Sequence, residues 1–185
     1  MEFVMELWKP IVLSGVAVFI LSAMAWTVLP HHRKEYGPMA NEDGVADAMR
    51  AGGIAPGRYS LPHAGDAKAM GTPEMKAKME RGPIAFITVM KGGNRGMGPM
   101  MVQSVIANII IATFVAYIAS TALPAGAAYM TVFCLVATAT FMAYGLGTIP
   151  DSIWFGKPWR SYALNAADSL VYALVTGGIF GWLWA

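Results

Sequence analysis

The sequence predicts an all-α membrane protein: a four-helix transmembrane bundle with a small cytoplasmic α/β-like cap between helices 1 and 2. Three observations predict this class. Hydrophobic residues make up 56% of the 185 residues and charged residues 13%, about half the charged share of an ordinary soluble protein. The 55 residues between Arg95 and Asp151 contain no Asp, Glu, Lys or Arg. Basic residues are concentrated in segments that alternate with the apolar runs.

Four apolar runs are long enough to cross a bilayer, which takes about 20 residues. Pro124 and Gly126 interrupt the uncharged stretch, and helix interiors avoid both residue types, so two spans lie there. The last span is short unless it begins near Ala163, with Asp168 turned toward protein or water. The expected spans are about 11–29, 101–122, 127–147 and 169–184.

The chain divides at the membrane boundaries. The expected parts are 1–30 with the first span, 31–100 as the cap, and 101–185 with three spans and an aromatic-basic connection at 149–168. Within the cap, Asn41 and Thr72 are expected to cap two short helices that end at glycines. Residues 56–63 look extended. Residues 84–90 have the composition of a strand or of a segment lying against the membrane surface.

Basic residues predict the orientation, because they accumulate on the cytoplasmic side. Ten of the thirteen Lys and Arg lie in 31–100, Lys157 and Arg160 lie between the last two spans, and Lys9 alone falls on the other side. We therefore expect a multi-pass protein with both termini in the periplasm and 31–100 in the cytoplasm.

The stretch HHRKEY, residues 31–36, raises the question of a metal site. His31 and His32 are neighbours, and neighbouring positions on a helix diverge. Glu35 could join His31 only if the helix continued past Pro30, and His63 is distant. Histidine and basic residues also suit the anionic headgroup region. We interpret the cluster as a membrane exit and expect no metal.

No histidine lies within the predicted spans, which excludes a transmembrane haem held by two histidines, and we expect no cofactor. Catalytic motifs such as GxSxG, a Walker loop or HExxH do not occur, so we expect no enzyme. Cys134 is the single cysteine, and it excludes an internal disulfide.

Polar and small residues in the spans favour helix packing over transport. Asn108 is the candidate for an interhelical hydrogen bond, and Gly177 and Gly181 fit close helix contact. Asp168 is the one acid near a span that could serve transport. Our preferred interpretation makes it an acid in the first turn of the last helix.

The connection before the last span interleaves aromatic and basic residues, which is typical of a headgroup belt. A specific lipid or a partner subunit could be held there, whereas nucleic acid is excluded because the loop is pinned between two spans. The candidate residues are Trp154, Phe155, Lys157, Trp159, Arg160 and Tyr162.

The C-terminal stretch FGKPWRSYALNAADSLVYALVTGGIFGWLW, with HHRKEY, GIAPGRY and GPIAFITV earlier, resembles a family of small uncharacterised bacterial inner-membrane proteins with about four spans. The resemblance covers most of the chain. It implies the same topology and a bacterial inner membrane, and it transfers no activity.

These observations predict a non-catalytic membrane protein whose partners are lipids and other membrane-protein subunits. We expect an accessory or assembly subunit of a larger complex, respiratory or photosynthetic. The alternative is a small transporter or lipid-handling protein using Asp168, Asn108 and the aromatic-basic connection. A water-filled cavity that reaches Asp168 would favour transport, and a flat apolar flank would favour a subunit.

Overall fold

The computed structural model describes residues 2–93 and 96–184. The protein is mostly helical, and four of its helical segments are long and apolar enough to cross a membrane, which confirms the main feature of the predicted class. These segments are α1 (Glu2–Thr27), α5 (Met97–Ala122), α6 (Tyr129–Tyr144) with its continuation, and α8 (Trp159–Leu183). A 3₁₀ turn (Leu146–Thr148) and α7 (Ile149–Trp154) extend α6, so that the third segment runs over Tyr129–Trp154.

Two of the long helices begin earlier than the spans expected from the sequence. Helix α1 begins at Glu2, well before residue 11, and it continues through Pro10, which is buried. Helix α8 begins at Trp159, so Asp168 lies nine positions inside it, which is about 14 Å along the helix axis. The expectation that Asp168 is a first-turn acid is therefore corrected.

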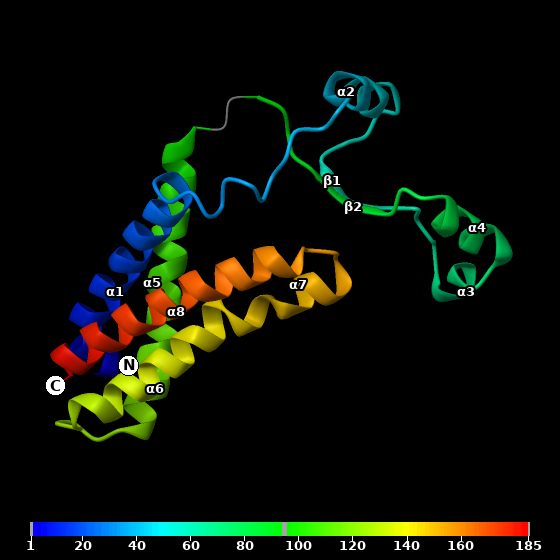
Figure 1. The fold of residues 1–185 in the computed structure, drawn as a ribbon. Helices are drawn as coiled ribbons and strands as arrows, with labels where there is room; N and C mark the ends of the chain where they lie inside the picture. Colours follow the sequence, from blue (N-terminus) through cyan, green and yellow to red (C-terminus); the bar gives the residue numbers. More distant parts are fainter. Residues whose placement is uncertain (1, 94–95, 185) are drawn as a thin grey trace. The chain divides into compact units, whose positions relative to one another are not determined.

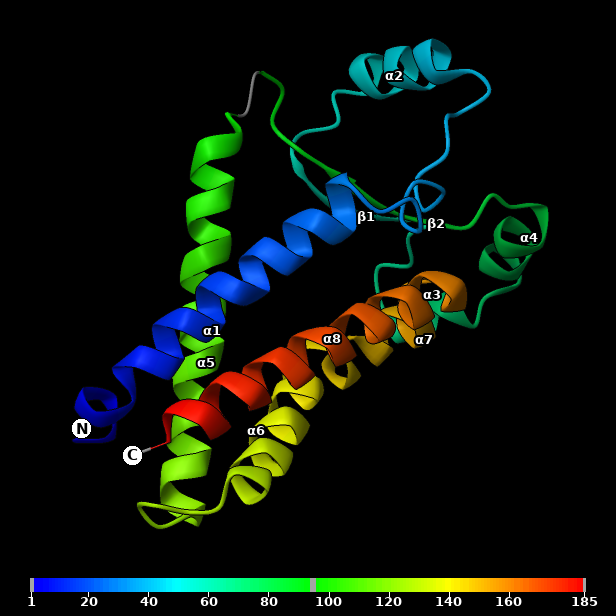
Figure 2. The same cartoon turned by 60° about the vertical axis from the view of Figure 1, so that its left-hand side comes forward.

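The four long helices form two closely packed pairs. Helix α1 packs on α5, α6 packs on α8, and α1 also packs on α8. In both ribbon views α6 and α8 run side by side while α1 crosses α5 (Figures 1 and 2). The start of α1 and the end of α8 lie near each other, beside the loop that joins α5 to α6 (Figure 1). Trp184 Nε1 donates a hydrogen bond to the carbonyl of Pro124 in that loop, at 3.0 Å.

The apolar core lies at this end of the bundle. It is formed by the first half of α1, the second half of α5, the first half of α6 and the last turns of α8. Its buried members are Leu7, Ile11, Ala112, Val115, Ala116, Ala119, Val132, Val136 and Phe180. All the buried residues of α5 fall within 112–119, so its first half is less buried. The bundle is therefore tightly packed at the end that carries the termini.

Small residues allow the helices to approach closely. A Cβ at Gly15 would lie 2.6 Å from Ile109 Cγ1, and one at Gly177 would lie 2.9 Å from the carbonyl oxygen of Phe133. A Cβ at Gly181 would meet the ring of Tyr129 at 2.8 Å. Glycine at these positions thus sets the α1–α5 and α6–α8 spacing.

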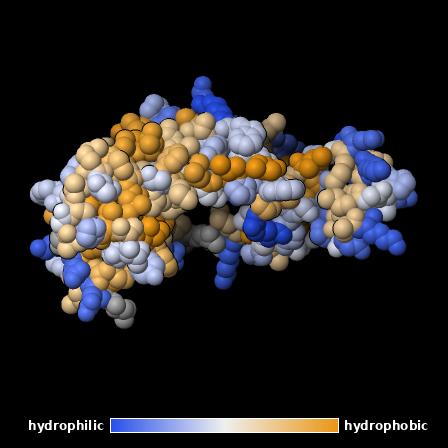
Figure 3. Space-filling model, turned by 90° about the horizontal axis from the view of Figure 1, so that it is seen from below, coloured by the Kyte–Doolittle hydropathy of each residue, from blue (hydrophilic) through white to orange (hydrophobic). Residues whose placement is uncertain are grey.

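Many large apolar side chains remain exposed on the long helices, including Ile20, Ile106, Ile110 and Phe114. Tan and orange apolar side chains dominate the visible surface of the helical unit (Figure 3). Such a surface suits lipid contact, since apolar patches of this extent are rare on soluble monomers.

Residues between Tyr36 and Gly96 form a separate compact unit. Its elements are α2 (Glu42–Ala51), β1 (Gly57–Leu61), α3 (Ala67–Met70), α4 (Pro73–Arg81) and β2 (Ala85–Val89). Asn41 and Thr72 cap α2 and α4 as predicted. The strands pair antiparallel, with Tyr59 opposite Ile87.

Candidate functional site

The site begins where the chain leaves α1. The helix ends at Thr27, and a turn begins at Pro30. In this turn the Arg33 amide donates a hydrogen bond to the Pro30 carbonyl. The Glu35 amide then bonds the His32 carbonyl at 3.0 Å. Because these residues lie in turns and not in a helix, neighbouring side chains are free to point to one place.

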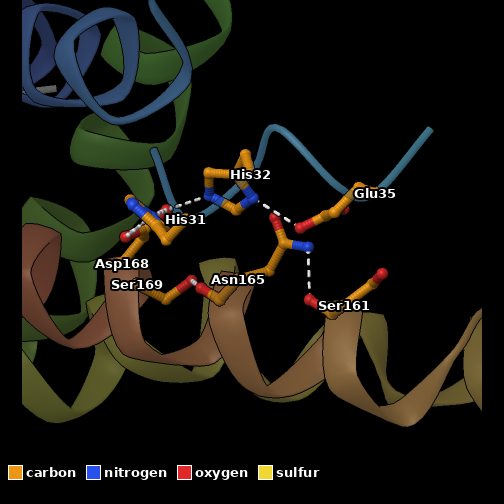
Figure 4. A network of polar contacts seen from close by, with 7 residues as sticks. All are labelled: His31, His32, Glu35, Ser161, Asn165, Asp168 and Ser169. Atoms are coloured by element: carbon orange, nitrogen blue, oxygen red, sulfur yellow. Dashed lines mark hydrogen bonds and ion pairs between the residues drawn. The ribbon is translucent and has the colours of Figure 1, made fainter. Parts of the chain in front are cut away.

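His31 and His32 both converge on Asp168 of α8 (Figure 4). His32 Nε2 lies 2.6 Å from one carboxylate oxygen of Asp168, and His31 Nε2 lies 3.0 Å from the other. On its far side, His32 Nδ1 lies 2.5 Å from Glu35 Oε1. Two carboxylates thus face the two nitrogens of one imidazole ring.

The network is largely shielded from solvent. The side chain of His32 is 1% exposed, that of Glu35 6% and that of Asp168 15%. Burial by itself would lower the pKa of His32, but the hydrogen bonds and negative charges of Asp168 and Glu35 outweigh it and raise the pKa above its usual value of 6.5. A protonated imidazole donates from both ring nitrogens, and the two flanking carboxylates stabilise that form of His32.

Neighbouring elements hold the two ends of the network. The Trp26 ring stacks on His32 with centroids 4.1 Å apart and planes 3° apart. Next to Asp168, Ser169 Oγ donates to the Asn165 carbonyl, and Asn165 Nδ2 donates to the Ser161 carbonyl, both at 2.7 Å (Figure 4). These bonds stay within α8 and fix side chains along the face that carries Asp168.

A partly open cavity of about 220 Å³ lies beside Asp168. It is bounded by the ends of α1, α6 and α8 away from the apolar core and by the middle of α5. Its lining residues are Val18, Ser22, Trp26, Asn108, Tyr144, Thr148, Lys157, Asn165, Asp168, Ser169 and Tyr172. Its lining thus combines the Asp168 carboxylate with amide and hydroxyl groups, the Lys157 ammonium and three aromatic rings.

A small void of about 10 Å³ lies deeper in the bundle and shares Val18, Asn108 and Tyr144 with the cavity lining. Ser14, Thr140 and Thr176 also line this void, and their hydroxyls are buried without a hydrogen-bond partner among the described residues. Buried polar atoms are normally paired. The void is close to the space that one water molecule requires, so polar groups continue from the cavity toward the apolar core.

The structure changes the interpretation of the two histidines as metal ligands. We expected His31 and His32 to diverge, as on a helix, but they lie beyond the helix end and meet at Asp168. In the sequence, the two histidines are candidates for a metal and Asp168 is a candidate for transport, at separate sites. No local signal joins positions 136 residues apart.

The other predicted site residues fall into two groups. Tyr144 OH donates to Asn108 Oδ1 at 3.0 Å, which joins α6 to α5, and Gly177 and Gly181 lie against α6. Of the six candidate residues named in the aromatic-basic connection, Lys157 is the one that lines the cavity. Trp154, Phe155 and Trp159 are exposed, and so is Arg160; Tyr162 is half-buried and packs edge-on against Trp159.

Comparison of the chain with protein-family models, curated proteins and solved structures found no match.

Proposed function

We propose that this protein is a small transport protein that moves a cation across the membrane by way of Asp168. The observation that carries the proposal is the polar cavity reaching Asp168, set against an apolar core at the opposite end of the same bundle. A bundle open at one end and closed at the other is what a carrier requires in one of its two access states.

The lining residues favour a cation. Asp168 supplies a carboxylate, and ionisable groups at this depth in membrane helices commonly mark ion or proton pathways. The rings of Trp26, Tyr144 and Tyr172 add faces that attract positive charge. Lys157 also lines the cavity. Its ammonium group repels an incoming cation, so the Lys157 side chain would move out of the cavity when a cation enters.

The deeper void indicates the direction of the path. Asn108 and Tyr144 border both spaces, so the pair that links α5 to α6 stands between the cavity and the unpartnered hydroxyls. In this proposal, opening toward the other side separates the apolar residues that now close the bundle.

A flux measurement tests the proposal. Purified protein is placed in liposomes that contain a trapped pH-sensitive dye, and a potassium diffusion potential drives protons inward. A sodium-sensitive dye tests Na⁺ in parallel. We expect flux that falls at least about tenfold in Asp168→Asn. The matched control is Asp151→Asn, because Asp151 is an exposed acid of α7 that does not line the cavity.

Flux equal to that of protein-free liposomes with both dyes would overturn the proposal. Flux that Asp168→Asn leaves unchanged would also overturn it, because the path would then bypass Asp168.

A second candidate is the accessory subunit, and one observation favours it. Trp154 and Trp159 stand 72% and 59% exposed on the same connection, beside the exposed ring of Phe155. Exposed aromatic groups of this size are common anchors at protein interfaces. Gentle-detergent purification from the native membrane, followed by native mass analysis, tests it. A stoichiometric partner that is lost in Trp154→Ala/Trp159→Ala and kept in Trp182→Ala would support the subunit; a chain that carries only lipid would not.

A further inference from the structure

We propose that His31, His32 and Asp168 bind a divalent transition-metal ion of the zinc type, with Glu35 holding His32 in place from behind. This inference goes beyond the transport proposal and does not depend on it. It replaces the expectation of a simple membrane exit.

The three donor atoms are already close enough to share an ion. One ring nitrogen of His31, one ring nitrogen of His32 and a carboxylate oxygen of Asp168 all lie within 4.8 Å of one another. Ligand atoms on one tetrahedral zinc lie about 3.3 Å apart, given bonds of about 2.0–2.1 Å. The histidine nitrogens lie 2.6 and 3.0 Å from the two carboxylate oxygens of Asp168, so side-chain shifts of about 1–1.5 Å would bring the three donors to zinc-ligand spacing.

Glu35 completes an arrangement typical of metal-binding histidines. Such histidines usually donate the proton on their second nitrogen to a carboxylate, which fixes the tautomer and the ring orientation. Glu35 Oε1 lies 2.5 Å from His32 Nδ1, so it leaves Nε2 directed at Asp168. The stacked Trp26 ring restrains the imidazole further. The position of His32 is thus determined from three sides.

The charges favour the ion as well. Asp168 and Glu35 form ion pairs with the two histidines. When both histidines are neutral, the cluster carries two negative charges in a shielded place, and a divalent cation balances both. Buried charges that are left uncompensated are costly.

The donor set selects the class of metal. Two imidazoles and one carboxylate suit zinc and its first-row neighbours, whereas Mg²⁺ and Ca²⁺ prefer oxygen ligands alone. Three protein ligands leave a fourth position for water or another group. The His31 side chain is 27% exposed, which gives the ion a way in.

The test is equilibrium binding by the full-length protein in detergent, purified through a histidine-free tag and stripped with a chelator. Zn²⁺ is titrated calorimetrically, and Co²⁺ is added separately as a spectroscopic probe whose visible absorption reports tetrahedral coordination. We expect one ion per chain. His31→Ala and Asp168→Asn should weaken binding at least about 100-fold and abolish the Co²⁺ spectrum, and Glu35→Gln should weaken it about 10–100-fold.

His63→Ala is the matched control, since His63 lies in the other unit and contacts Ser60; it should leave binding unchanged. His31→Ala keeps the His32–Asp168 pair, so it should still fold, and an unchanged gel-filtration profile checks this. Failure to bind either metal, binding unaffected by His31→Ala and Asp168→Asn, or binding lost in His63→Ala would each overturn the proposal. Because no transport is measured, an absence of cation flux leaves this result standing.

Discussion

His32 Nε2 lies 2.6 Å from the carboxylate of Asp168, although 136 positions separate the two residues. This contact ties the turn after α1 to the middle of α8, and it draws in Glu35 on one side and His31 on the other. It places an ionic cluster beside a polar cavity at the end of the bundle that the apolar core leaves open. The two proposals both start from this arrangement.

The contact predicts how stability depends on pH in the metal-free protein. The groups that face His32 are Asp168, Glu35 and His31, and the net effect raises the pKa of His32 above 6.5. A raised pKa in the folded state means that the stabilisation is complete below about pH 6.5 and is lost as the pH rises through the higher folded value. With chelator present, we expect the melting temperature to fall above pH 6.5 and this fall to be shallower in His32→Gln. Parallel profiles for the two proteins would contradict the prediction.

The cavity predicts a pattern of chemical accessibility along α1. In a Cys134→Ala background, Ser22→Cys should react with a charged, membrane-impermeant thiol reagent, because Ser22 lines the cavity. Ile20 and Met24 lie two positions before and after Ser22 along α1, but their side chains are on the exposed apolar surface. Lipid would exclude the charged reagent from Ile20→Cys and Met24→Cys. They should react at least about tenfold more slowly. Equal rates at the three positions would show that no polar cavity separates them.

The contact between α6 and α8 predicts opposite effects at adjacent glycines. A Cβ at Gly177 would lie 2.9 Å from the Phe133 carbonyl oxygen, whereas one at Gly178 would meet Tyr129 OH at an ordinary 3.6 Å. Gly177→Ala should therefore destabilise the bundle by about 1–3 kcal/mol. Gly178→Ala should be neutral or stabilising, since alanine favours the helix by up to about 1 kcal/mol. The melting temperatures of the two variants in detergent test this prediction. A Gly177→Ala protein as stable as Gly178→Ala would contradict it.

The unpartnered hydroxyl of Thr140 predicts a stabilising substitution. Thr140 is buried and its Oγ1 has no partner among the described residues, so Thr140→Val keeps the shape and removes a desolvated polar atom. We expect a gain of about 1 kcal/mol. Thr138→Val is the control, because Thr138 Oγ1 is exposed and already donates to the Cys134 carbonyl. A fall in melting temperature for Thr140→Val alone would mean that the hydroxyl is hydrated in the void.

The sequence by itself determined the features that local forces set. The four spans follow from hydropathy, and the ends of α2 and α4 follow from capping by Asn41 and Thr72, because each depends on a few neighbouring residues. Two helices begin before the spans that hydropathy predicts: α1 continues through the buried Pro10 from Glu2, and α8 begins well before Asp168.

Only the tertiary structure decided the site. Whether His31 and His32 diverge or converge depends on where α1 ends and how the chain turns at Pro30. Whether Asp168 meets them depends on the packing of α1 against α8. A hydropathy pattern shows which residues are apolar, but it does not show which side chains, distant in sequence, lie together at one end of the bundle. For that reason the sequence predicted the bundle, and the packing of its helices placed the histidines against the carboxylate.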